Sequence, residues 1–256
     1  MMTITFNRPG IGTVAVTYDK LTNSPIEIDT TQWPMVPNQT RCFMKYTPNG
    51  FRMLPYCRDQ YSDSYPKKLA IIVESPNSKE FDNNFNPIAP LIGRSGNTFD
   101  RKIVFKFNTW FNTTLSQASD ISEGTIVRVE LVNPVQFQTS LFHLLNNKIP
   151  YLQLKQAHKK YTLNKKLRDD VWKALYVDLK YEGDFIAEIL KIAPDYIVNC
   201  CTGNSSSPVK RFLPISRVDA IGQKELKDIV RSSLYKAFIT HSLDVPYIED
   251  VHPRVW

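Results

Sequence analysis

Four apolar runs are the feature of this sequence that most constrains its fold. They are KKLAIIVE (67–74), TIVRVELV (125–132), DYIVNCC (195–201) and VPYIEDV (245–251). Continuous runs of this kind are typical of strands buried on both faces of a parallel sheet. Helical patterns separate the runs, and strands that alternate with helices predict an α/β fold with helices on both sides of the sheet.

The spacing of the apolar residues predicts where the helices lie. Gly96 opens a pattern in which apolar residues recur every three or four positions, namely Phe99, Ile103, Phe107, Trp110, Phe111 and Leu115. Further helices are expected at 140–146, 164–180, 184–191 and 223–238, and Pro194 ends the third of these. Residues 67–256 are therefore expected to form a three-layer sandwich with a central four-stranded, mostly parallel sheet. In residues 1–66, short pieces in which apolar and polar residues alternate are separated by Pro and Asn. This pattern predicts a β or irregular N-terminal extension of unknown role.

Composition excludes some classes of protein. The chain is 42% hydrophobic, which excludes a disordered polypeptide. Lys and Arg total 32 against 25 Asp and Glu, and the net charge of +7 favours a polyanionic partner such as nucleic acid. No apolar stretch approaches the length of a membrane span and no signal peptide is visible. The four cysteines form no CxxC pair, so we expect a reduced, cytoplasmic protein without a metal or cofactor.

Polar residues follow each of the four predicted strands. Glu74 and Ser75 follow the first, Asn133 the second, Thr202 the third and His252 the fourth. In open α/β sheets, ligands bind beyond the carboxyl ends of the strands. The sequence therefore predicts a functional site built from these residues.

The order of three motifs resembles the uracil-DNA glycosylase superfamily, especially its thermophile-type branch. The motifs are VESPN (73–77), PLIGRSGNTFD (90–100) and HPRVW (252–256), and the middle one is the most specific. Compared with that branch, Val73 and Asn77 replace glycines, and Leu91 stands where an aromatic stacks on the flipped base. The branch's iron–sulfur cysteines have no counterpart here. The resemblance thus implies the fold more firmly than it implies uracil as the substrate.

The resemblance implies a DNA glycosylase that excises uracil or a modified, bulky, phage-type base. The base is flipped out of the stack and its N-glycosidic bond is hydrolysed, in DNA repair or anti-phage defence. Glu74 or Asp82 would orient the attacking water, and His252 would donate to the departing base. The expected base-binding residues are Leu91, Asn133 and Ser75. The expected DNA-phosphate-binding residues are Arg94, Ser95, Gly96 and Arg254.

Alternative interpretations remain open at this point. Glu74 can be a loop brace, Asn133 and His252 can be turn residues before proline, and Ser95 can be a helix cap. A catalytically silent nucleic-acid-binding protein of the same fold is the second hypothesis. An unrelated α/β hydrolase or nucleotide-binding enzyme is disfavoured, because GxSxG, P-loop and GxGxxG motifs are absent from the sequence. The expected state is a monomer that binds DNA and no membrane.

Overall fold

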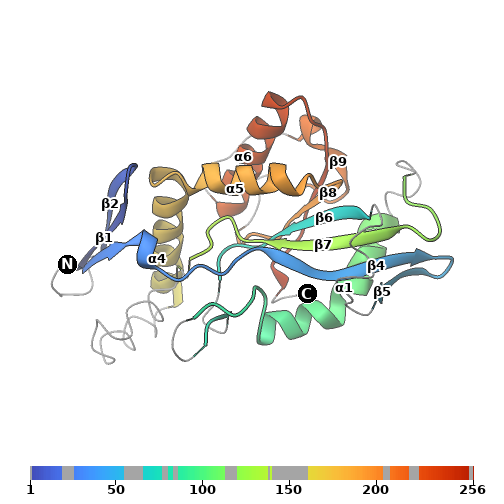
Figure 1. Ribbon diagram of the computed structural model, residues 1–256, viewed down its shortest axis with the longest axis horizontal. Coiled ribbons are helices and arrows are strands. Elements are labelled where there is room, and N and C mark those ends of the chain that lie inside the picture. The colour runs from blue at the N-terminus through green and yellow to red at the C-terminus, as the bar shows by residue number, and fades with distance from the viewer. Residues whose placement is uncertain are drawn as a thin grey trace. The chain divides into compact units, whose positions relative to one another are not determined.

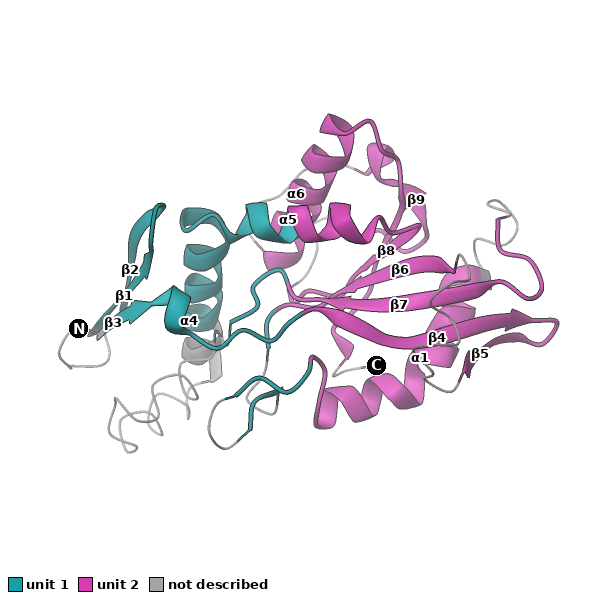
Figure 2. Cartoon of the chain, in the orientation of Figure 1, with its two compact units in different colours: residues 1–37, 75–89, 134–185 teal, residues 38–74, 90–133, 186–256 magenta. Residues whose placement is uncertain are grey.

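A computed structural model describes residues 2–18, 26–54, 66–76, 80–82, 86–112, 120–137, 139, 161–203, 208–218, 225–253 and 256. The chain divides into two compact units (Figure 2). Unit 1 comprises residues 1–37, 75–89 and 134–185, and unit 2 comprises residues 38–74, 90–133 and 186–256. Within the described residues, no helix has the length and apolar character needed to cross a membrane.

Unit 2 is built on a seven-stranded mixed sheet with the order β5-β4-β7-β6-β8-β10-β9 (Figure 1). Its strands are β4 (Gln39–Thr47), β5 (Gly50–Leu54), β6 (Lys67–Ile72), β7 (Ile126–Val132), β8 (Tyr196–Asn199), β9 (Leu213–Pro214) and β10 (Pro246–Glu249).

The four strands expected from the apolar runs form the centre of this sheet. Strand β6 pairs in parallel with β7 and with β8, and β8 pairs in parallel with β10. The expected width of four strands is wrong, because β4, β5 and β9 extend the sheet by antiparallel pairing. Strands β4 and β5 come from the segment interpreted as an N-terminal extension. Their alternating pattern suits antiparallel strands, but it does not say with which partner they pair.

Helix α1 (Arg94–Asn112) supplies much of the core on one face of the sheet. The aromatic stripe expected from its sequence is buried, and Leu115 lies outside the described residues. The stripe packs against alternate residues of the central strands, including Leu69, Ile71, Val127 and Val129. The ring of Phe107 meets that of Phe51 on β5 at a centroid distance of 5.2 Å, so α1 also covers the antiparallel edge.

The other face of the sheet carries the end of α5 (Tyr181–Ile192) and α6 (Leu226–Thr240) (Figure 1). Helix α5 ends where the sequence predicts, because Ala193 takes a left-handed φ of 49° and Pro194 follows. The Nζ atom of Lys68 donates to the carbonyl of Ile192 at 2.8 Å and ties this helix end to β6.

Unit 1 is a smaller assembly of a sheet and helices. Its sheet has the order β2-β1-β3, formed by β1 (Met2–Arg8), β2 (Gly12–Tyr18) and β3 (Ile26–Asp29). The predicted helix at 164–180 is α4 (Tyr161–Lys173) followed by a π-helical segment, η4 (Ala174–Asp178), while the predicted helix at 140–146 lies outside the described residues. Trp172 and Tyr176 stack at 4.5 Å in this core.

Candidate functional site

The carboxyl ends of β6 and β8 mark the point at which the strand order reverses. The chain leaves β6 through α1 and returns in β7 on one side, whereas it leaves β8 through α6 and returns in β10 on the other. In open α/β sheets, the crevice at such a switch point is the usual place for a ligand. Glu74 follows β6 and Thr202 follows β8, so both residues lie at this point.

Glu74 is held firmly at the switch point. Its side chain is only 3% exposed. The hydroxyl of Thr202 donates to Oε2 of Glu74, and the Thr202 backbone N–H donates to the same oxygen at 3.3 Å. A buried carboxylate is stable only where hydrogen bonds or charges compensate for the lost water, and Thr202 provides two of these bonds. The sequence did not predict this pairing.

Cys201 lies directly beside this pair as a neutral thiol. Burial raises its pKa well above the ordinary value, the Glu74 carboxylate raises it further, and the Lys227 ammonium acts in the opposite direction. The protonated Sγ donates to the carbonyl of Val73 at 2.8 Å. Cys201 therefore braces the strand end, and its burial disfavours the thiolate form.

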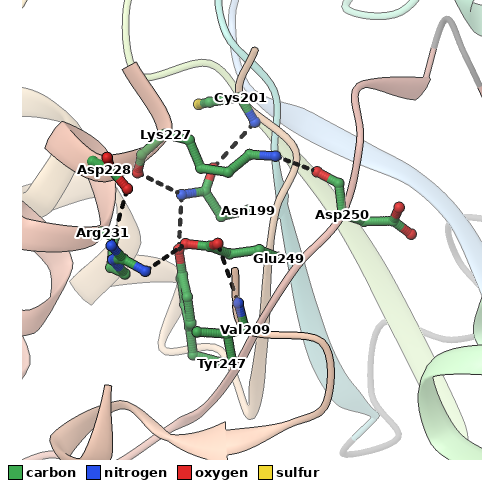
Figure 3. Close-up of polar contacts among 9 residues, drawn as sticks. All are labelled: Asn199, Cys201, Val209, Lys227, Asp228, Arg231, Tyr247, Glu249 and Asp250. Carbon is green, nitrogen blue, oxygen red and sulfur yellow. Dashed lines mark hydrogen bonds and ion pairs between the residues drawn. The ribbon is translucent and has the colours of Figure 1, made fainter. Parts of the chain in front are cut away.

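Lys227 is a charged residue of this region that sequence reasoning missed. It occupies the first turn of α6, and only 6% of the residue is exposed. Its Nζ atom donates to the backbone carbonyl of Asp250 at 2.6 Å (Figure 3). Nothing in the sequence LKDIV distinguishes it from an ordinary solvated lysine, because its burial depends on the strands that surround it.

A buried polar network fixes the turn that carries Thr202 (Figure 3). The side chain of Asn199 accepts from the backbone N–H of Cys201 at 3.1 Å and donates to the hydroxyl of Tyr247 at 2.8 Å. That hydroxyl donates to Glu249 at 2.9 Å, and Glu249 pairs with Arg231 at 3.3 Å. Arg231 also binds Asp228 at 2.9 Å, so this buried cation has two carboxylate partners.

Asn133 is the most unusual polar residue in unit 2. It follows β7 and is 2% exposed. Its backbone N–H donates to Oδ1 of Asn38 at 2.9 Å, but neither Oδ1 nor Nδ2 of its own amide has a hydrogen-bond partner among the described residues. The Nδ2 atom of Asn38 also has none, and Asn38, unlike Asn133, is among the residues that line a polar cavity of about 410 Å³. Buried polar atoms are nearly always bonded, so these amides are suited to a ligand.

The PLIGRSGNTFD segment forms the tight entry into α1. Leu91 adopts a φ of 52° and its side chain, 2% exposed, packs into the hydrophobic core. A Cβ on Gly96 would lie 1.8 Å from the carbonyl oxygen of Leu91, so only glycine permits this approach. Ser95 and Gly96 are buried, whereas Arg94 is exposed. Of these three proposed phosphate contacts, only Arg94 presents its side chain to solvent.

The end of β10 brings His252 to the same edge of the sheet. The backbone N–H of Asp250 donates to the carbonyl of Asn199 at 3.1 Å, which extends the pairing with β8 beyond the strand. The Asp250 carboxylate accepts from Lys106 and from the Trp110 indole, each at 2.8 Å. His252, two residues later, is partly buried. Arg254 lies outside the described residues.

Ser75 and Asp82 belong to unit 1, and their side chains are engaged there. The hydroxyl of Ser75 is 2.9 Å from that of Thr139. Asp82 accepts from the backbone N–H and the side-chain amide of Asn86, both at 2.9 Å, and closes a short loop. The structure therefore brings together Glu74, Thr202, Cys201 and Lys227 in unit 2. Of the two carboxylates considered for water activation, Glu74 is the one in this group.

Comparisons with known proteins give no identification. No protein-family model, curated protein or solved structure matches the chain.

Proposed function

We propose that this protein is a DNA glycosylase that hydrolyses the N-glycosidic bond of uracil or a modified base after base flipping. The observation that carries the proposal is the buried amide of Asn133 at the carboxyl edge of the sheet, whose two polar atoms have no hydrogen-bond partner among the described residues. An amide offers one acceptor and two donor hydrogens, which suits the Watson–Crick edge of a pyrimidine. The proposal also rests on the motif resemblance and the parallel order β7-β6-β8-β10.

The reaction requires three groups. The bond between the sugar C1′ and the base nitrogen breaks, and the base takes the bonding electron pair and leaves as an anion. The water oxygen bonds to C1′ and loses a proton, and the base anion takes up a proton, so that the products are the free base and an abasic sugar. In our proposal Glu74 orients the water and stabilises the positive charge on the sugar. Asn133 holds the base, and His252 donates a hydrogen bond to the leaving anion.

The proposal also includes the layer arrangement of unit 2 and the cellular compartment of the protein. We place residues of unit 2 in a three-layer arrangement around the four parallel strands, with Glu74 and Asn133 above adjacent strands β6 and β7. We place the protein in the cytoplasm, which agrees with the free thiols of Cys42, Cys200 and Cys201.

Base release is the direct test. Duplex and single-stranded oligonucleotides would carry uracil, hydroxymethylated pyrimidines or glucosylated pyrimidines, and free base would be measured by mass spectrometry. Release from at least one substrate is expected, with a fall of about 100-fold or more in Glu74→Gln. If a folded protein releases none of these bases, the proposal is wrong.

A second candidate function is a catalytically silent nucleic-acid-binding protein. It is favoured by the state of Glu74, whose carboxylate is buried and bonded to Thr202 rather than open to water. This alternative predicts that DNA binding weakens with salt and survives both Glu74→Gln and His252→Ala. Binding without base release would select it.

A further inference from the structure

Helix α1 presents an outward stripe that the proposed reaction does not use. Arg94, Arg101 and Phe105 follow one another at intervals of seven and four residues, so they share one side of the helix, and Lys102 lies one turn before Phe105. All four are exposed. Phe105 is 65% exposed, more than any other large apolar side chain in the described part of the chain.

The stripe carries positive charge that no carboxylate in the described part of the chain neutralises. Asp100, the acidic residue of α1, is occupied by Arg41 through contacts of 3.2 and 2.7 Å. Lys106 turns inward to Asp250. No carboxylate among the described residues pairs with Arg94, Arg101 or Lys102. Three cations without a carboxylate partner in the described ranges therefore flank one exposed ring.

This combination matches the chemistry of single-stranded nucleic acid. Cations bind phosphates, and an exposed aromatic ring stacks on an unpaired base whatever the sequence. A duplex offers its phosphates to the cations, but its paired bases give Phe105 nothing to stack on. A purely charged surface would not need an exposed phenylalanine, and an apolar protein partner would not need three unpaired cations.

We propose that this stripe binds a single-stranded segment of nucleic acid, with Phe105 stacked on a base and Arg94, Arg101 and Lys102 on flanking phosphates. The inference rests on the proposed function in that the protein binds nucleic acid, and it adds a preference for unpaired strands. It does not depend on base release.

Fluorescence anisotropy with an unmodified 20-nucleotide strand and the matching duplex, over a series of salt concentrations, tests the stripe. Phe105→Ala and Phe105→Leu should weaken single-strand binding by roughly 5- to 100-fold and change duplex binding less than about twofold. Arg101→Gln with Lys102→Gln should reduce the salt slope for the single strand by about 1.4, because each phosphate contact contributes about 0.7.

Two exposed residues of α6 provide matched controls. Lys236→Gln removes a cation and Ile239→Ala removes an apolar side chain, and neither should alter binding. Unchanged melting temperatures would show that all variants fold, as expected for exposed positions. Three results would each overturn the proposal for the stripe. They are wild-type single-strand affinity in Phe105→Ala, an equal loss of affinity for single strand and duplex in that variant, and an unchanged salt slope in the variant with Arg101→Gln and Lys102→Gln.

Base release by the same variants separates the two proposals. If base release persists and the α1 substitutions do not change single-strand binding, the glycosylase proposal is supported and the proposal for the stripe is wrong. Stripe-dependent binding of the single strand without release of any base would support the stripe and refute the glycosylase. No binding to either oligonucleotide would refute the proposal for the stripe, and the base-release assay alone would then decide the glycosylase proposal.

Discussion

Asn133 is the residue of the proposed site that both lowers folding stability and would bind the base. A buried polar atom without a partner costs about 1–3 kcal/mol of folding free energy. Both atoms of its amide are in this state among the described residues. Such a cost is expected where the group is reserved for a ligand, because functional groups are often maintained at the expense of stability.

Asn133→Leu should therefore separate stability from function. Leucine has a similar shape and no polar atoms, so the free energy of unfolding should rise by about 1 kcal/mol, while base release should fall by about 100-fold. Urea denaturation and the release assay measure the two effects. As a control, Asn199→Leu should lower stability by about 2 kcal/mol, since the Asn199 amide is bonded to Tyr247 and to the Lys227 carbonyl. A destabilised Asn133→Leu protein would contradict the interpretation.

Gly96 has a purely steric reason to be glycine. Its missing side chain allows the carbonyl of Leu91 to approach the first turn of α1. Gly96→Ala should lower the unfolding free energy by about 2–3 kcal/mol, because the added methyl group forces the entry loop away. Gly183→Ala is the matched control on α5: a Cβ there meets nothing within 4 Å, and stability should rise by up to about 1 kcal/mol. Equal effects of the two substitutions in urea denaturation would argue against the steric reason.

At the scale of elements, β8 and β10 are joined to α6 by the network in Figure 3 as well as by strand pairing. Tyr247 is its central connection, because its hydroxyl accepts from Asn199 and donates to Glu249. The network fixes the turn after β8, which in turn fixes the Thr202 hydroxyl against Glu74. The geometry of the site thus depends on buried residues of β8, β10 and α6.

Tyr247→Phe should cost about 1–3 kcal/mol, since it keeps the ring but leaves two buried polar groups short of a partner. It should also loosen Thr202 and reduce base release without abolishing it. Chemical denaturation and the release assay measure both effects. Tyr235→Phe on the half-exposed side of α6 is the control and should change neither. If the Tyr247→Phe protein is as stable as the wild type, the hydrogen bonds of the Tyr247 hydroxyl do not contribute to the free energy of unfolding.

At the scale of the whole molecule, buried thiols couple stability to pH. Burial raises the pKa of Cys42 to about 12 and also raises the pKa values of Cys200 and Cys201 well above the ordinary value. The ordinary thiol value of 9.0 applies to the unfolded chain. Above that pH the unfolded state loses protons while the folded state keeps them, so unfolding becomes more favourable.

Stability should therefore be constant with respect to these thiols below about pH 9 and fall between about pH 9 and 12. Each thiol contributes a slope approaching 1.4 kcal/mol per pH unit. Urea denaturation from pH 7.5 to 10.5 measures the decline. Cys42→Ala should flatten it by one thiol's share, and a decline of unchanged steepness in that variant would contradict the assignment.

The sequence by itself determined the local elements of this protein. The four apolar runs became the parallel centre of the sheet, and the aromatic stripe of α1 became core, because strand and helix periodicities are carried by neighbouring residues. The tertiary structure alone decided which strands extend the sheet, that Lys227 is buried, and that Thr202 meets Glu74. The last contact joins residues 128 positions apart. No local pattern encodes such a meeting, since it follows from the order in which the strands pair and from the close packing that brings their ends together.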